Sequence, residues 1–107
     1  MSITRKEELI MLSILNLKEN AYLIGIRDYL STTTGKKVSL TSIHLPLTRL
    51  EKNGLIESGF GEATAVRGGR RKRVYKITKP GLIELNEYKR INDVLWANYS
   101  ELTARPD

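Results

Sequence analysis

Apolar residues recur along the first part of the chain at the intervals of three and four that are typical of amphipathic helices. A first helix is expected over residues 5–17, because Thr4 and Glu7 have the spacing of a capping box and an apolar stretch follows them. A second helix is expected from residue 21 or 22 to about residue 32, before a polar stop that ends in glycine. Its inward face is formed by Leu23, Ile26, Tyr29 and Leu30.

A third apolar repeat predicts a helix over residues 41–53. The Thr41 hydroxyl is placed to cap its start, and Gly54 is placed to end it in the left-handed conformation. Residues 36–39, just before this helix, are compatible with a very short strand. The side chains expected in the core are Ile43, Leu47 and Leu50 of this helix, together with Tyr75 and Ile77 further along the chain.

Two runs over residues 55–60 and 74–78 predict the strands of a hairpin. Thr78 is placed to cap a last helix that carries Pro80 in its first turn and extends to about residue 103. Its apolar seam is longer than three short helices and a hairpin would cover, so we expect a second copy of the chain to bury it in a two-fold dimer. The expected interface residues are Tyr88, Ile91, Leu95, Tyr99 and Leu102, after Leu85 at the start of the seam.

The order of these elements predicts a mainly α-helical fold with a small β-hairpin, an α+β winged helix-turn-helix. Residues 1–79 would form the DNA-binding part and residues 80–107 the dimerisation helix, both within one compact unit. In such a fold the third helix enters the major groove of DNA.

Positive charge is concentrated in the predicted hairpin. Of the 18 Lys and Arg residues, seven fall within residues 67–79, which contain no acidic residue. The other 11 basic residues face 12 acidic ones, so the formal charge of +6 comes from this one segment. A polyanion is therefore the expected partner, and double-stranded DNA is the polyanion that a winged helix binds.

The composition excludes several other functions. A chain of 107 residues without cysteine has no disulfide and no thiolate metal site, and its single histidine makes a zinc site improbable. No catalytic triad, P-loop, dinucleotide fingerprint or carboxylate cluster is apparent, so we expect neither an enzyme nor a cofactor. The N-terminus has neither a signal peptide nor a spanning helix, which indicates a soluble cytoplasmic protein that does not enter a membrane.

Three segments resemble the PadR family of bacterial transcriptional regulators. They are Ala21-Tyr22-Leu23-Ile24, the stretch VSLTSIHLPLTRLEKNGLIES over residues 38–58, and RGGRRKRVYKITKPG over residues 67–81. The resemblance covers roughly residues 9–85, and the absence of a large C-terminal domain is similar to the short subgroup of the family. It implies a homodimer that uses one C-terminal helix as its interface, and more often a repressor than an activator.

The chain departs from the family pattern at three positions. His44 stands where a tyrosine is common in the reading helix, Pro46 stands where a small residue is common, and Leu23 follows Ala-Tyr where glycine is frequent. Pro46 deletes a helical hydrogen bond and crowds the preceding turn, so the reading helix is expected to be bent or short there.

Candidate DNA contacts come from the third helix and the hairpin. Ser42, at the helix start, is a natural phosphate ligand, while His44 and Thr48 face the groove. Arg49 is either a further contact or a partner of Glu51 or Glu57. In the hairpin the candidates are Arg67, Arg70, Arg71, Lys72 and Arg73, and the sequence does not rank them.

Trp96, the only tryptophan, lies on the last helix. It either fills the dimer interface together with Tyr99 or forms the wall of a pocket for a small aromatic effector, as the resemblance implies for some relatives. The sequence thus predicts a homodimeric, PadR-like DNA-binding regulator of pseudo-palindromic operators. A winged-helix module that binds only proteins and an effector-sensing regulator are the alternatives.

Overall fold

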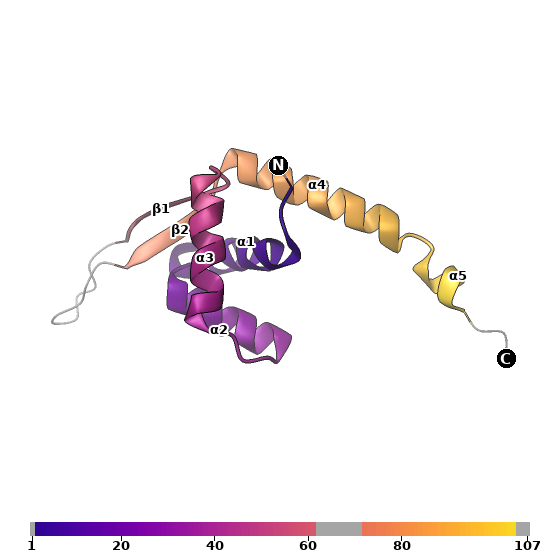
Figure 1. The fold of residues 1–107 in the computed structure, drawn as a ribbon, viewed down its shortest axis with the longest axis horizontal. Helices are drawn as coiled ribbons and strands as arrows, with labels where there is room; N and C mark the ends of the chain where they lie inside the picture. Colours follow the sequence, from indigo (N-terminus) through magenta and orange to yellow (C-terminus); the bar gives the residue numbers. More distant parts are fainter. Residues whose placement is uncertain (1, 62–71, 105–107) are drawn as a thin grey trace.

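The computed structural model describes residues 2–61 and 72–104 of the chain. In chain order the elements are α1 (Arg5–Leu17), the 3-10 turn η1 (Lys18–Asn20), α2 (Leu23–Thr34), α3 (Leu40–Lys52), β1 (Ile56–Phe60), β2 (Arg73–Ile77), α4 (Lys79–Trp96) and α5 (Tyr99–Thr103). Helices α1 to α3 form a body from which the hairpin and α4 extend in opposite directions (Figure 1). The predicted α+β architecture, mainly helical with one two-stranded hairpin, is confirmed.

The first helix begins with the predicted capping box. The Thr4 hydroxyl accepts a hydrogen bond from the Glu7 amide at 3.1 Å, and the Glu7 carboxylate accepts one from the Thr4 amide at 2.8 Å. Two backbone donors that the helix itself leaves unpaired are thereby satisfied.

One hydrophobic core joins the helical body to the hairpin. The predicted core residues Ile43, Leu47, Leu50 and Tyr75 are buried, and Ile77 is partly buried against them. The complete buried set is Ile3, Ile10, Met11, Ile14, Ala21, Ile26, Leu30, Ile43, Leu47, Leu50, Leu55, Ile56, Tyr75 and Leu85.

The start of α3 differs from the prediction. Ser39, not Thr41, is the N-cap, and its hydroxyl accepts a hydrogen bond from the Ser42 amide at 3.2 Å. The short strand expected over residues 36–39 is also wrong, since the only strands among the described residues are β1 and β2. The Val38 amide instead donates to the Ser31 hydroxyl at 3.2 Å, so a side chain takes the place of a strand partner.

Pro46 lies in the middle of α3 without shortening it. The helix keeps 13 residues, from Leu40 to Lys52. Proline has no amide proton, so the Ser42 carbonyl loses its intrahelical donor. Packing of the buried side chains on either side of Pro46 holds the backbone helical across the missing bond.

The hairpin is fixed to the helices by backbone hydrogen bonds. Strands β1 and β2 pair antiparallel, with Ser58 opposite Tyr75. Gly54 turns the chain out of α3 with φ of 76°, as predicted. The Tyr75 amide donates to the Ala21 carbonyl at 2.8 Å, which attaches β2 to the segment between η1 and α2.

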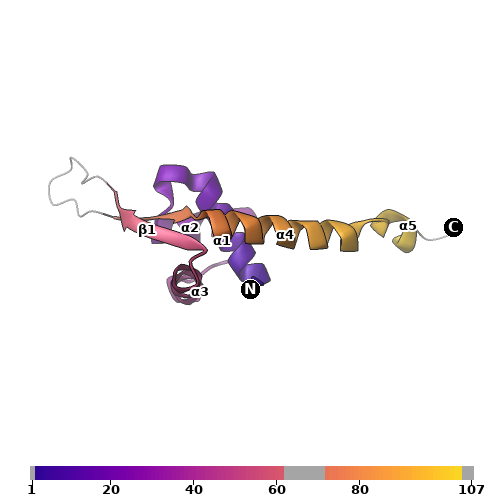
Figure 2. The ribbon, with the colours of Figure 1, turned by 90° about the horizontal axis from the view of Figure 1, so that it is seen from above.

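Helix α4 leaves the body as an arm, in line with the hairpin but on the opposite side, while α3 lies to one side of that line (Figure 2). The predicted cap is confirmed, since the Thr78 hydroxyl accepts from the Gly81 amide at 3.1 Å and Pro80 lies in the first turn. The prediction of one helix to about residue 103 is wrong, because Asn98 adopts φ of 67° and separates α4 from α5. Asparagine tolerates this left-handed conformation better than most residues do.

Gly81, in the first turn of α4, lies close to the backbone of Leu55 in the segment between α3 and β1. A Cβ at this position would lie 2.0 Å from the Leu55 carbonyl oxygen. We predict that Gly81→Ala lowers the free energy of unfolding by about 1–3 kcal/mol, since overpacking outweighs the roughly 1 kcal/mol gain in helix propensity. Denaturant unfolding measures the change.

Gly59→Ala is the matched control, because its Cβ would meet no atom within 4 Å. If Gly81→Ala were as stable as this control, the contact between α4 and Leu55 would be wrong.

Candidate nucleic-acid interface

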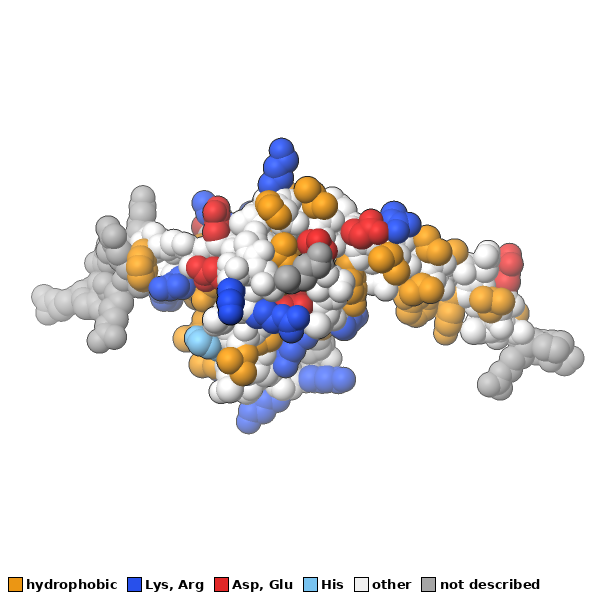
Figure 3. Space-filling view, turned by 45° about the horizontal axis from the view of Figure 1, so that its top comes forward, with side chains coloured by type: hydrophobic (Ala, Val, Ile, Leu, Met, Phe, Trp, Pro, Cys, Tyr) orange, Lys and Arg blue, Asp and Glu red, His pale blue; other side chains and the backbone are white. Residues whose placement is uncertain are grey.

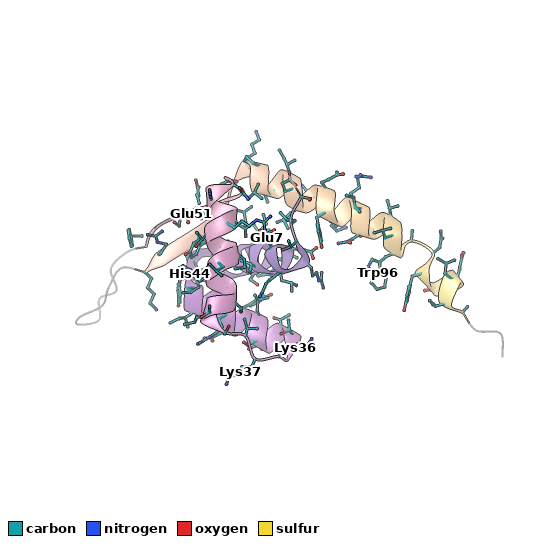
Figure 4. All side chains as sticks on the ribbon, in the orientation of Figure 1. Glu7, Lys36, Lys37, His44, Glu51 and Trp96 are labelled. Atoms are coloured by element: carbon teal, nitrogen blue, oxygen red, sulfur yellow. The ribbon has the colours of Figure 1, made fainter. Side chains whose placement is uncertain are left out.

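The outward face of α3 is polar and exposed. His44 and Thr48 project to solvent, as predicted, on the side of the helix away from the buried Ile43 and Leu47. In Figure 4 the His44 imidazole lies on the side of α3 that faces the hairpin. This face therefore has the exposure that a groove-reading helix requires.

Two hydroxyls on α3, those of Ser42 and Thr48, already donate hydrogen bonds to nearby backbone carbonyls. Ser42 donates to the Ser39 carbonyl at 2.8 Å, and Thr48 donates to the His44 carbonyl at 3.0 Å. Ser42 would have to break this bond to donate to a phosphate, so the structure gives it a part in the helix start. Thr48 still presents acceptor lone pairs and a methyl group, which suit a base amino group or a thymine methyl.

The fold brings α3 and β2 together around one concavity. Its lining includes His44, Thr48 and Lys52 from α3 and Arg73 and Tyr75 from β2, with Glu51 also on the α3 side. Arg73, a predicted DNA contact, is thus placed beside the two predicted groove-facing residues of the helix. A duplex that reaches one set would reach the other.

Arg73 is held in this position by a short chain of polar groups. Its guanidinium donates to the Ser58 hydroxyl at 3.4 Å, and Ser58 donates to the Glu51 carboxylate at 2.8 Å. The guanidinium also lies 5.4 Å from the centroid of the Phe60 ring. Sequence reasoning missed Glu51 and Ser58 in this role. The hairpin register brings Ser58 near Arg73, whereas the contact between Glu51 and Ser58 depends on how β1 packs against α3.

Arg49 pairs with neither Glu51 nor Glu57, the two partners that the sequence suggested. Its Nε lies 3.7 Å from a carboxylate oxygen of Glu7, the residue of the α1 capping box. The Glu51 carboxylate instead accepts the hydrogen bond from the Ser58 hydroxyl of β1. Arg49 nevertheless remains largely exposed.

Tyr75 of β2 is buried and also lines this concavity. Burial raises the pKa of its phenol, the Arg73 charge acts in the opposite direction, and the Glu51 charge adds to the increase. The phenol is therefore neutral around pH 7 and adds no negative charge to the concavity.

The remaining hairpin candidates are distributed differently. The Lys72 ammonium lies 4.3 Å from the centroid of the Tyr22 ring, toward the start of α2, in a cation–π arrangement. Arg67, Arg70 and Arg71 lie outside the described residues. Of the two hairpin candidates that the structure describes, Lys72 and Arg73, it is Arg73 that lines the concavity beside the outward face of α3.

The arm formed by α4 and α5 carries exposed apolar side chains, visible as a line of orange along its length (Figure 3). Leu85 is buried in the core and Tyr88 is partly buried against it, whereas the later residues of the seam are open. Ile91, Leu95, Trp96, Tyr99 and Leu102 are exposed by 45% to 79%. The Trp96 and Tyr99 rings contact each other with centroids 4.8 Å apart.

Neither a metal-binding cluster nor a membrane-spanning helix is present in the described part of the chain. Residues 2–61 and 72–104 contain no group of three or more His, Cys, Asp or Glu side chains that could hold a metal ion. No helix within these residues has the length and apolar character needed to cross a membrane.

Several solved structures share the fold of this chain. The chain superposes on a PadR-like transcriptional regulator from Bacillus cereus with a TM-score of 0.74 at 24% identity, over 94% of this chain and 92% of the other. A PadR-like transcription factor from Bacteroides fragilis gives 0.70 at 26% identity, over 92% and 93%. A PadR family regulator from Eggerthella lenta gives 0.70 at 25% identity, over 95% and 87%.

A scan against protein-family models finds no match to this sequence, and a search of curated proteins finds none either. The structural neighbours nevertheless cover almost the whole chain, 94% and 92% of it for the first two. The chain therefore has a PadR-like winged-helix fold, as its sequence motifs predict.

The Arg73–Ser58–Glu51 chain can be tested by a double-mutant cycle on DNA affinity. Ser58→Ala should weaken binding about two- to tenfold, the effect of one hydrogen bond that orients a charged group. Because Ser58 acts through Arg73, the variant carrying Ser58→Ala and Arg73→Ala should bind no more weakly than Arg73→Ala alone. Fluorescence anisotropy with a labelled duplex measures all four proteins.

Ser100→Ala, on the exposed α5, controls for the loss of a hydroxyl. Additive losses from the two substitutions would contradict a positioning role for Ser58.

Proposed function

We propose that this chain, with its PadR-like fold, is a DNA-binding transcriptional regulator that acts as a homodimeric repressor on pseudo-palindromic operators. One observation supports the DNA-binding part most directly. The exposed residues His44 and Thr48 of α3 and the basic Arg73 of β2 line a single concavity. Helix α3 would read the major groove while the hairpin grips the adjacent backbone.

Charge supports a nucleic acid over a protein partner. The chain carries a formal charge of +6, and the hairpin segment supplies it. Each phosphate that a basic side chain neutralises contributes about 0.9 to the slope of log affinity against log salt concentration. Binding should therefore weaken steeply with added salt, whatever base sequence α3 prefers.

Sequence preference is assigned to the side chains that reach base edges. The Thr48 hydroxyl already donates a hydrogen bond to the His44 carbonyl. Thr48 therefore offers a base its methyl group and the acceptor lone pairs of the hydroxyl. His44 is exposed one turn earlier and can contact a base edge or a phosphate. These two residues are the proposed readers, while Arg73 and the other hairpin basic residues supply affinity.

Dimerisation is inferred from the α4 arm. Beyond Tyr88 the helix has left the core, and a short isolated helix is only marginally stable in water. Its open seam includes Leu95 and Trp96, exposed by 72% and 63%. A second copy would cover both seams symmetrically and place two α3 helices on one duplex. Repression is the simplest mode of action, since occluding a promoter needs only these two surfaces.

The aromatic pair on the arm favours a second candidate, a regulator that senses a small planar aromatic effector. Trp96 and Tyr99 are both exposed and in contact, and stacked aromatic rings are suited to a flat ligand. The same pair would equally fill a dimer interface, so the effector stays a prediction.

Selection of bound sequences from random duplex DNA at two salt concentrations tests the DNA-binding role. We expect a two-fold-symmetric motif with half-sites about one helical turn apart, together with strong salt dependence. Thr48→Ala should change the preferred bases at specific positions, whereas Arg73→Ala should weaken binding to all sequences alike.

Salt-sensitive binding without a motif would reduce the role to non-specific DNA binding. The absence of any protection in a footprint would instead favour a winged-helix module that binds only proteins. A Thr48→Ala variant with unchanged base preference would show that the reading face is assigned to the wrong residues.

Sedimentation equilibrium tests the dimer. Leu95→Glu places a charge in the seam and should raise the dimer dissociation constant by at least about tenfold, or 1.4 kcal/mol. Asn86→Glu is the matched control, since it adds the same charge nine residues earlier, half a turn away around the helix. Equal effects of the two variants, or a monomeric wild-type protein, would overturn the proposed interface.

A further inference from the structure

We propose that Lys6, Lys36 and Lys37 form a second DNA-backbone surface, on the opposite side of α3 from the hairpin. This inference rests on the proposed DNA-binding function and deepens it. The three residues, called here the lysine surface, come from α1 and from the segment that joins α2 to α3. They are separate from the cluster of charge in the hairpin.

The fold gathers these lysines around the start of α3. Lys6, Lys36 and Lys37 line one concavity together with Arg5, Ser39 and Ser42. Lys6 also borders a neighbouring depression with Leu45, Pro46 and Arg49 of α3. Basic side chains therefore follow the edge of α3 from its first turn to Arg49.

The charge of this edge is only partly compensated. Arg5 pairs with Glu8 at 2.6 Å, and Arg49 lies 3.7 Å from Glu7. Within residues 2–61 and 72–104, Lys6, Lys36 and Lys37 form no ion pair, and no acidic side chain lines their concavity. All three are exposed, so their charges are available to a partner.

The position of the lysine surface relative to α3 suggests the partner. In Figure 4, His44 lies on the hairpin side of α3, Glu7 at the start of α1 lies on the other side, and Lys36 and Lys37 lie at the N-terminal end of the helix. Basic side chains and the single histidine appear on the same face of the molecule (Figure 3). The lysines thus flank the proposed reading helix without covering it.

Duplex geometry explains why both flanks would be basic. The major groove is about 12 Å wide, and a helix with its side chains nearly fills it. The two phosphate strands that border the groove then lie one on each side of α3. Arg73 and the rest of the hairpin meet one strand, and Lys6, Lys36 and Lys37 meet the other.

The test compares two variants that lose the same charge. The first carries Lys6→Gln, Lys36→Gln and Lys37→Gln on the lysine surface. The control carries Lys18→Gln in η1 and Lys89→Gln and Arg90→Gln in α4, three exposed positions outside both the basic hairpin segment and the lysine surface. Affinity for a labelled mixed-sequence duplex is measured over a range of salt concentrations, after sedimentation has shown both variants to have the oligomeric state of the wild type.

We expect the first variant to lower the salt slope by about 2 to 5 for a dimer, at 0.9 for each of up to six phosphates, while the control leaves it nearly unchanged. Phosphate-ethylation interference on a selected duplex should lose its signal on one strand beside each half-site. The double variant Lys36→Glu and Lys37→Glu should weaken binding further, because it adds repulsion.

Equal salt slopes for the first variant and the control would overturn the lysine surface while leaving the DNA-binding function intact. Interference that persists on both strands in the first variant would overturn it as well. Failure of the wild-type protein to bind any duplex would overturn the proposed function, and the lysine surface with it.

Discussion

Burial of one stripe of α3 is the constraint on which the rest of the structure depends. Ile43, Leu47 and Leu50 are almost completely excluded from solvent, which fixes the rotation of the helix and turns its polar side outward. The same burial accounts for the intact helix around Pro46. A proline in a helix interior costs about 3 kcal/mol, whereas each fully buried aliphatic side chain contributes about 1.5–3 kcal/mol, so packing prevails.

The hairpin is positioned by the same body. The hydrogen bond from the Tyr75 amide to the Ala21 carbonyl docks β2, and the burial of Tyr75 orients the strand. The contacts of β1 and β2 with α3 also explain why the acidic Glu51 lies on the proposed DNA face. The Glu51 carboxylate accepts a hydrogen bond from the Ser58 hydroxyl, and this hydroxyl accepts one from the Arg73 guanidinium and holds it toward the concavity. The negative charge of Glu51 carries a small electrostatic cost at this surface, but through Ser58 it fixes the direction of the Arg73 side chain.

The arm divides into two parts with different sources of stability. Its first turns are anchored by the Thr78 cap, the close approach of Gly81 to Leu55, and the burial of Leu85. Among the described residues, none beyond Tyr88 belongs to the hydrophobic core, and the apolar seam of the arm faces solvent. Under the proposed function, assembly and DNA reading are therefore linked, since the same seam that needs covering would set the distance between two reading helices.

The sequence by itself determined the features that depend on neighbours three or four residues apart: the capping box at Thr4, the buried stripe of α3, the cap at Thr78, and the order of elements that defines the fold. It did not determine which of two nearby hydroxyls caps α3, or that Asn98 interrupts the last helix, because local patterns allow both outcomes. Only the tertiary structure decided which groups more than a few residues apart in the chain meet, such as Arg49 with Glu7 and Glu51 with Ser58. Groups distant in the chain are brought within a few ångströms by packing, and no periodicity in the sequence records those distances.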